Sequence, residues 1–84
     1  MKPVPPFWFL MRQGKMESVA PETYRLTAPN LQEAYISVRK SEPGGWLGVF
    51  RLQPDGADAG TAPAETEPGA WEAAFELYRL RLVV

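Results

Sequence analysis

The strongest periodic pattern of apolar residues lies near the C-terminal end of the chain, in residues 69–82. At about 100° per residue, the apolar stripe of this stretch covers roughly one third of a helical circumference. Its members are Trp71, Ala74, Phe75, Tyr78 and Leu82. The charged residues Glu72, Glu76 and Arg79 fall on a separate arc. The pattern predicts an amphipathic helix over 69–80 that packs its aromatic stripe on the rest of the fold.

The residues around this helix indicate where it begins. Thr66 can accept a hydrogen bond at its start, with Pro68 and Gly69 in the first turn. The other end is ambiguous, because Arg79 and Arg81 alternate with apolar residues as they would in a strand. The sequence leaves open whether 80–84 continues the helix or is extended.

A second apolar strip lies on the far side of the same helix. It consists of Ala73, Leu77 and Leu80, roughly opposite the stripe led by Trp71. We expect that one helix cannot direct both strips into one sheet. The second strip should therefore meet solvent, a partner or an N-terminal hairpin folded over it.

Alternating residues on both sides of a glycine-rich turn predict a β-hairpin over 34–53. Pro43-Gly44-Gly45 supplies the turn chemistry. Pairing Lys40 with Trp46 puts the apolar residues of both arms on one face, which should lie under the helix. The pairs on this face are Val38–Gly48, Ile36–Phe50 and Ala34–Leu52.

A helix over 30–40 is the alternative to the first arm of this hairpin. Asn30 and Glu33 fit a capping box, and the apolar residues that follow have helical spacing. The β-branched Ile36 and Val38 favour the strand instead. The hairpin is the preferred interpretation.

Residues 7–19 form a second predicted hairpin, which follows an extended lead-in that contains three prolines. Gln13-Gly14 is typical of a two-residue turn, and it would pair Met11 with Met16. The first arm is apolar on both of its faces. Either both faces are covered in the core, or one of them contacts a partner.

Residues 23–27 indicate a further short strand, and 54–67 indicate a mobile loop or a short edge strand. The whole chain, 1–84, is short enough to form a single small domain. The predicted fold class is α+β, with a small antiparallel sheet built from the two hairpins and one C-terminal helix packed on it.

Composition narrows the classes of function. The net charge is −1, which argues against non-specific nucleic-acid binding through a basic field. The chain contains no histidine and no cysteine, so the usual general base, nucleophile and zinc ligands are missing. We therefore expect no enzyme and no catalytic, cofactor-binding or metal-binding residues. No apolar run reaches the length of a membrane span or a signal-peptide core, so we expect a soluble cytoplasmic protein with no membrane partner.

One mixed aromatic and basic group lies on the other face of the predicted 34–53 hairpin. It contains Tyr35, Arg39 and Arg51. Such a sheet face can stack on bases and contact phosphates. A nucleic-acid-binding module is therefore the alternative function.

Apolar residues beyond the needs of a small core favour an interaction protein. The candidate interaction residues are Phe7, Trp8, Leu47, Ala73, Leu77 and Leu80. Small domains commonly gain burial by assembling, and a symmetric dimer is the simplest assembly. The sequence predicts a non-catalytic protein–protein interaction or self-association module, and it does not specify the partner or the biological process.

Overall fold

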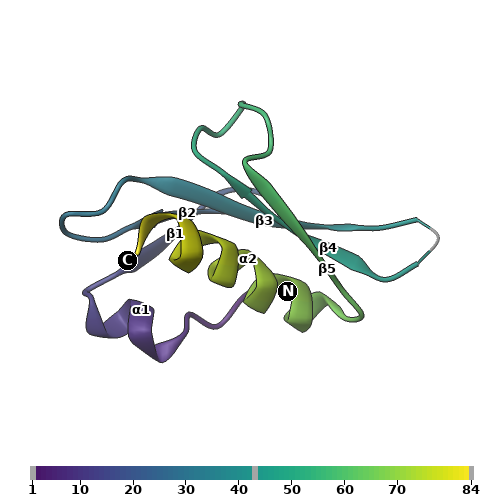
Figure 1. The fold of residues 1–84 in the computed structure, drawn as a ribbon, viewed down its shortest axis with the longest axis horizontal. Helices are drawn as coiled ribbons and strands as arrows, with labels where there is room; N and C mark the ends of the chain where they lie inside the picture. Colours follow the sequence, from purple (N-terminus) through teal and green to yellow (C-terminus); the bar gives the residue numbers. More distant parts are fainter. Residues whose placement is uncertain (1, 43, 84) are drawn as a thin grey trace.

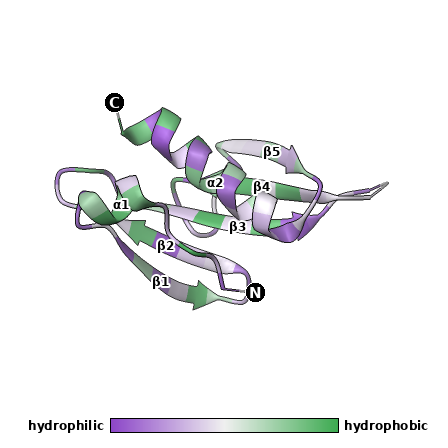
Figure 2. Cartoon of the chain, turned by 90° about the horizontal axis from the view of Figure 1, so that it is seen from below, coloured by the Kyte–Doolittle hydropathy of each residue, from purple (hydrophilic) through white to green (hydrophobic). Residues whose placement is uncertain are grey.

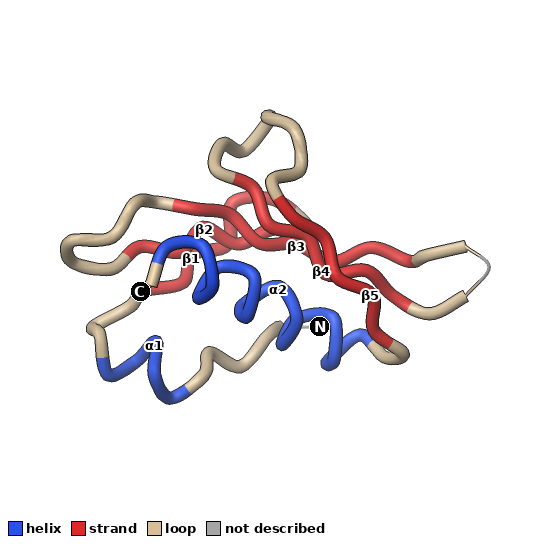
Figure 3. Tube along the Cα trace, in the orientation of Figure 1, coloured by secondary structure: helices blue, strands red, loops and turns tan. Residues whose placement is uncertain are grey.

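The computed structural model describes residues 2–42 and 44–83. In chain order, its elements are α1 (Phe7–Met11), β1 (Lys15–Ala20), β2 (Thr23–Thr27), β3 (Ala34–Lys40), β4 (Trp46–Arg51), β5 (Gly60–Ala64) and α2 (Glu67–Leu82). Figures 1 and 3 show one sheet with both helices on the same side of it. The fold is a small α+β arrangement with the C-terminal helix packed on an antiparallel sheet, as predicted.

The sheet is a five-stranded antiparallel meander, in the order β1-β2-β3-β4-β5. Residues in the left-handed region help to reverse the chain, with φ of 60° at Glu22 and 65° at Asn30. Between β3 and β4, the Ser41 N–H donates to the Gly45 carbonyl at 3.1 Å. Pro43, which the sequence also places in this turn, lies outside the described residues. The meander leaves β1 and β5 as the two edges of the sheet.

Helix α2 begins where the capping chemistry predicts. The Thr66 side chain accepts a hydrogen bond from the Gly69 N–H at 3.1 Å, which satisfies one of the free donors of the first turn. The predicted aromatic stripe of Trp71, Phe75 and Tyr78 is buried. The helix runs two residues further at each end than the predicted 69–80. Of the ambiguous stretch 80–84, the part as far as Leu82 is helical and Val83 is extended, while the last residue lies outside the described part of the chain.

The closest approach of α2 to the sheet is made over a glycine. A methyl group placed on Gly48 would lie 2.4 Å from the Ala70 carbonyl oxygen and 2.9 Å from the Ala74 nitrogen. Because Gly48 on β4 and Ala70 and Ala74 on α2 are all small, the helix backbone packs directly against the strand. This contact brings the large side chains on either side of it into one core.

The predicted 34–53 hairpin is confirmed with its register. Lys40 pairs with Trp46, and the apolar face has Ile36 opposite Phe50 beneath the helix. Residues 34–40 are a strand rather than the alternative helix, because only the strand places alternate side chains on the two faces of a sheet. β4 ends at Arg51, one residue before the predicted pairing of Ala34 with Leu52.

The predicted hairpin over 7–19 is wrong, because its first arm is the helix α1. The Pro6 carbonyl accepts hydrogen bonds from the Phe9 and Leu10 N–H groups at 3.1 and 3.2 Å, which starts a helical turn. The Gly14 N–H closes the following turn onto the Phe9 carbonyl at 2.9 Å. Gln13-Gly14 is therefore a turn between a helix and a strand, with φ of 60° at Gln13.

The strand that follows this turn pairs with β2 instead of with residues 7–12. Met16 lies opposite Leu26 and Glu17 lies opposite Arg25. The helical turn buries the Phe9 ring completely and leaves Trp8 half-buried against the core. A strand in its place would have had to place consecutive aromatic residues on opposite faces of the sheet.

Aromatic side chains join α1 to α2. The Phe9 ring lies edge-on to Phe75 and Tyr78, with ring centroids 5.5 and 5.8 Å apart. Trp8 stacks on Tyr78 at 6.1 Å. The ring of Phe50 in β4 lies 6.4 Å from the same Tyr78 ring, centroid to centroid. Tyr78, a residue of α2, therefore contacts both α1 and the sheet.

Helix α2 covers the half of the sheet formed by β3, β4 and β5. α1 lies beside α2 near β1 and β2, as Figures 1 and 2 both show. β5 occupies the middle of 54–67, the stretch for which the sequence left open a mobile loop or a short edge strand. Because β5 widens the sheet on one side of α2, it also provides a surface for part of the second apolar strip of that helix.

Candidate interaction surface

The outward face of α1 is the largest exposed apolar feature of the helical layer. Phe7, Leu10 and Met11 are spaced by three and four residues, so they share one side of the helix. They are 76%, 53% and 68% exposed. Phe9 points the opposite way and is fully buried. Figure 2 shows α1 coloured mostly hydrophobic, whereas α2 alternates between hydrophobic and hydrophilic bands.

The N-terminal segment that carries α1 also has a charge of its own. Residues 2–16 contain Lys2, Arg12 and Lys15 and no acidic residue. The other six basic residues and all ten acidic residues lie from Glu17 onward, which leaves the segment at +3 and the remainder at −4 within a net charge of −1. An apolar face on a segment with an excess of positive charge is complementary to a protein surface that is apolar and acidic.

The second apolar strip of α2 (Ala73, Leu77 and Leu80) is covered only in part. Ala73 and Leu77 are half-buried, and Leu77 lies beside Gly60 of β5. Leu80 is 66% exposed. Leu77 and Leu80 border a shallow hollow of about 200 Å³ that also touches Phe50. The expectation that the entire strip lacks a surface to pack on is therefore wrong for Leu77, because β5 extends the sheet beneath it.

The other candidate interaction residues lie apart from one another. Trp8 is half-buried against Tyr78. Leu47 is half-buried on the face of the sheet opposite the helices, where it pairs with Arg39 and Pro63. The structure therefore does not bring the six candidates into one patch. Leu10 and Met11, which were absent from that set, join Phe7, and helical spacing applied to residues 7–11 would have found them.

The Tyr35, Arg39 and Arg51 group is present on one sheet face but is engaged within the chain. The Asp58 carboxylate accepts from Arg39 at 3.0 Å and from Arg51 at 2.7 Å. Figure 1 shows the β4–β5 loop, which carries Asp58, standing on the face opposite the helices. The hydrogen bonds from Arg51 and then Arg39 hold the pKa of the Asp58 carboxyl below its ordinary value. This loop was not recognised from the sequence as a partner of the two arginines.

Tyr35 is likewise occupied. Its hydroxyl donates to the Glu33 carboxylate at 2.6 Å, which raises the pKa of the tyrosine. Only 7% of the residue is exposed. Arg25 lies alongside and forms ion pairs with Glu17 and, at 3.9 Å, with Glu33. A base could not stack on the Tyr35 ring without displacing its neighbours.

The described residues hold no cluster of potential metal ligands, and two of their polar side-chain atoms are buried without a partner. Across residues 2–42 and 44–83, no three histidine, cysteine or acidic side chains come together as metal ligands would. The Tyr78 hydroxyl and the Trp71 Nε1 are buried and lack hydrogen-bond partners within that part of the chain. Burial raises the pKa of Tyr78, so its hydroxyl stays protonated at neutral pH.

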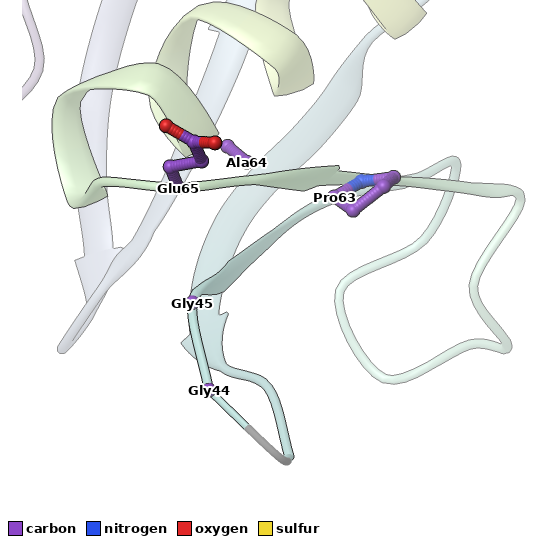
Figure 4. Close-up of a pocket in the computed structure, with 5 residues that line it drawn as sticks. All are labelled: Gly44, Gly45, Pro63, Ala64 and Glu65. Atoms are coloured by element: carbon purple, nitrogen blue, oxygen red, sulfur yellow. The ribbon is translucent and has the colours of Figure 1, made fainter.

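A hollow of about 540 Å³ lies beside the β3–β4 turn. It is lined by Gly44, Gly45, Pro63, Ala64 and Glu65. Figure 4 shows the Glu65 carboxylate turned toward the start of α2, away from the two glycines. With one ionisable group and an open shape, this hollow offers no pair of groups for acid–base chemistry.

Searches against protein-family models, curated proteins and solved structures found no match to this chain. Neither helix of the described residues has the length and apolar character needed to cross a membrane.

Proposed function

We propose that this protein is a non-catalytic interaction module that binds a protein surface through the outward face of α1. Among protein partners, we favour a second copy of the chain. The observation that carries the proposal is the exposure of Phe7, Leu10 and Met11 on one face of a helix whose other two residues, Trp8 and Phe9, pack against the core. Removing each such side chain from water is worth about 1.5–3 kcal/mol when its burial is complete.

The charge of the N-terminal segment supports a partner with an acidic surface. Because residues 17–84 carry the excess of acidic groups, the remainder of a second copy meets that requirement. Self-association is also a common way for small domains to gain buried area. The proposal keeps the cytoplasmic location expected from the sequence, and cell fractionation tests it.

Nucleic-acid binding stays the alternative, with less support. Stacking requires an accessible ring, and Tyr35 is buried. Phosphate contacts require free cations, and Arg39 and Arg51 are both paired with Asp58. Titration of labelled oligonucleotides at low salt tests this alternative directly.

The proposed function is tested by measuring mass in solution. The protein should be a dimer by light scattering, and replacing Phe7, Leu10 and Met11 together with serine should yield a folded monomer. Leu80→Ser is the matched control, because it removes an equally exposed leucine from α2 and should leave the dimer intact. A wild-type chain that stays monomeric at the highest attainable concentration would rule out self-association.

A further inference from the structure

Strand β1 is an open edge of the sheet. It pairs with β2 on one side only, and five of its six residues are exposed. In the described part of the chain, its backbone makes no hydrogen bond outside this ladder. The opposite edge, β5, contains Pro63, and proline lacks the N–H that a further strand would need. β1 contains no proline, and its pairing with β2 is regular from Lys15 to Ser18 before a shift of register between Ser18 and Ala20, so the regular part of this edge is able to accept another strand.

The side chains of β1 have a self-complementary order. Met16 packs against the core on the helix side of the sheet. Its neighbours Lys15 and Glu17 therefore share the other face, where they lie opposite Thr27 and Arg25 of β2. A two-fold axis perpendicular to the sheet and midway between the Met16 residues of two copies would place each Lys15 opposite the Glu17 of the other copy, with residues 15–17 of each strand in the ladder.

We propose that a second copy of this chain adds antiparallel to the start of β1, over residues 15–17, with Lys15 facing Glu17 across the junction. This inference rests on the proposed function, since it assigns the surface on which the two copies meet. The charges select the register. A shift of the partner strand by two residues in either direction would place Lys15 against Lys15 or Glu17 against Glu17, and like charges directly opposite one another are destabilising.

The same arrangement places the α1 helices of the two copies on one side of the joined sheet. Only Arg12 to Gly14 separate α1 from β1, and α1 lies near β1 and β2 in Figures 1 and 2. A two-fold axis perpendicular to the sheet keeps both helical layers on one side of the joined sheet. The axis passes between the two copies of Met16, so the α1 helix of each copy lies on the chain segment that leads into the junction.

Charge reversal tests the register. Lys15→Glu and Glu17→Lys should each weaken the dimer by about tenfold or more, because both cross-strand pairs become like-charged. The double variant Lys15→Glu/Glu17→Lys should recover it. An equimolar mixture of the two single variants should form a heterodimer, in which both pairs again have opposite charges. Sedimentation velocity reports the mass in every case, and circular dichroism confirms that each variant is folded.

The double variant also serves as the control for contacts that the single variants lose within the monomer. Glu17→Lys also removes the ion pair of Glu17 with Arg25, and the double variant lacks that ion pair as well. Recovery of the dimer in the double variant therefore assigns the effect of the single variant to the junction and not to the monomer.

A cross-link gives an independent test, because the chain has no native cysteine. Met16→Cys should form a disulfide-linked dimer on mild oxidation, whereas Thr61→Cys on β5 should not. A dimer that ignores both charge reversals and fails to cross-link, yet is lost in the α1 serine variant, would overturn this junction and leave the proposed function standing. A monomeric wild-type protein would overturn both.

Discussion

At the scale of single residues, Gly48 determines how closely α2 approaches the sheet. Its neighbours across the interface are backbone atoms of Ala70 and Ala74 rather than the ends of flexible side chains. A side chain at this position cannot be accommodated by a rotamer change, since the helix itself would have to move. The glycine is therefore required by packing between backbones and not by an unusual backbone conformation.

The substitution Gly48→Ala should destabilise the protein by about 1–3 kcal/mol, the usual cost of overpacking a core. The matched control is Gly44→Ala, where an added methyl group would meet nothing within 4 Å. The midpoints of urea unfolding should separate the two variants. Equal midpoints would show that α2 does not lie against β4 as described.

Asp58 makes the outer face of the sheet sensitive to pH. Its hydrogen bonds with Arg51 and Arg39 lower the pKa of the folded state below the ordinary value of 3.8. A group of this kind stabilises the fold above the unfolded pKa, and the contribution is lost as pH falls through the folded pKa. Acidification should therefore loosen the β4–β5 loop before the core unfolds.

Amide exchange at Ala59 reports this change, because its N–H donates to the Phe50 carbonyl at 2.8 Å at the end of the loop. Asp58→Asn should lower the protection factor of that amide (its exchange rate relative to the intrinsic rate at the same pH) at neutral pH, and acidification should then cause no further loss of protection. Asp55→Asn, in the same loop, should leave both unchanged. Equal exchange in all three proteins would mean that the arginine pairs do not hold the loop.

At the scale of elements, the two predicted hairpins show why some patterns determine a structure and others do not. In β3 and β4 the alternation is continuous in both arms and meets at one turn, so the register follows from the sequence. Five successive apolar residues, as in Phe7–Met11, have no period of two and no period of 3.6. The helix forms there because the Pro6 carbonyl accepts hydrogen bonds from Phe9 and Leu10 and because the Phe9 ring packs beside Tyr78. Neither interaction follows from the spacing of apolar residues in the sequence.

Phe9 and Phe7 should therefore differ sharply when each is replaced with alanine. Phe9→Ala removes a fully buried ring and should cost about 3–5 kcal/mol, while Phe7→Ala should change stability by less than about 0.5 kcal/mol in the monomer. Chemical denaturation at a concentration below that of dimer formation measures both. Similar losses for the two variants would contradict the orientation of α1.

The candidate sites were harder to predict than the elements. The sequence placed Tyr35, Arg39 and Arg51 on one face, and the strand register confirms this. It did not reveal that Asp58, on a loop without periodicity, would pair with both arginines. Exposure also depends on neighbours: Leu77 is half-buried because β5 runs beneath it, whereas Leu80 one turn away is not.

At the scale of the whole molecule, apolar exposure and positive charge coincide in the N-terminal segment, which also adjoins an open strand edge. An apolar face alone would bind without orientation, and an open edge alone would invite unlimited strand addition. In the proposed dimer they act together at one junction, while Pro63 disfavours addition at the opposite edge. A closed dimer is the assembly that these features favour over a fibre.

The meander has a consequence for how the chain folds. Each strand pairs with the one before it, so every step of sheet formation closes only a short loop, and such local topologies fold quickly. Helix α2 is the exception, because it follows all five strands in the chain and must return over β3 and β4. Until it docks, Ile36, Phe50 and their neighbours form an uncovered apolar sheet face. The C-terminal helix therefore acts as the final closure of the folding reaction, and a chain that lacks it would present an aggregation-prone surface in place of a core.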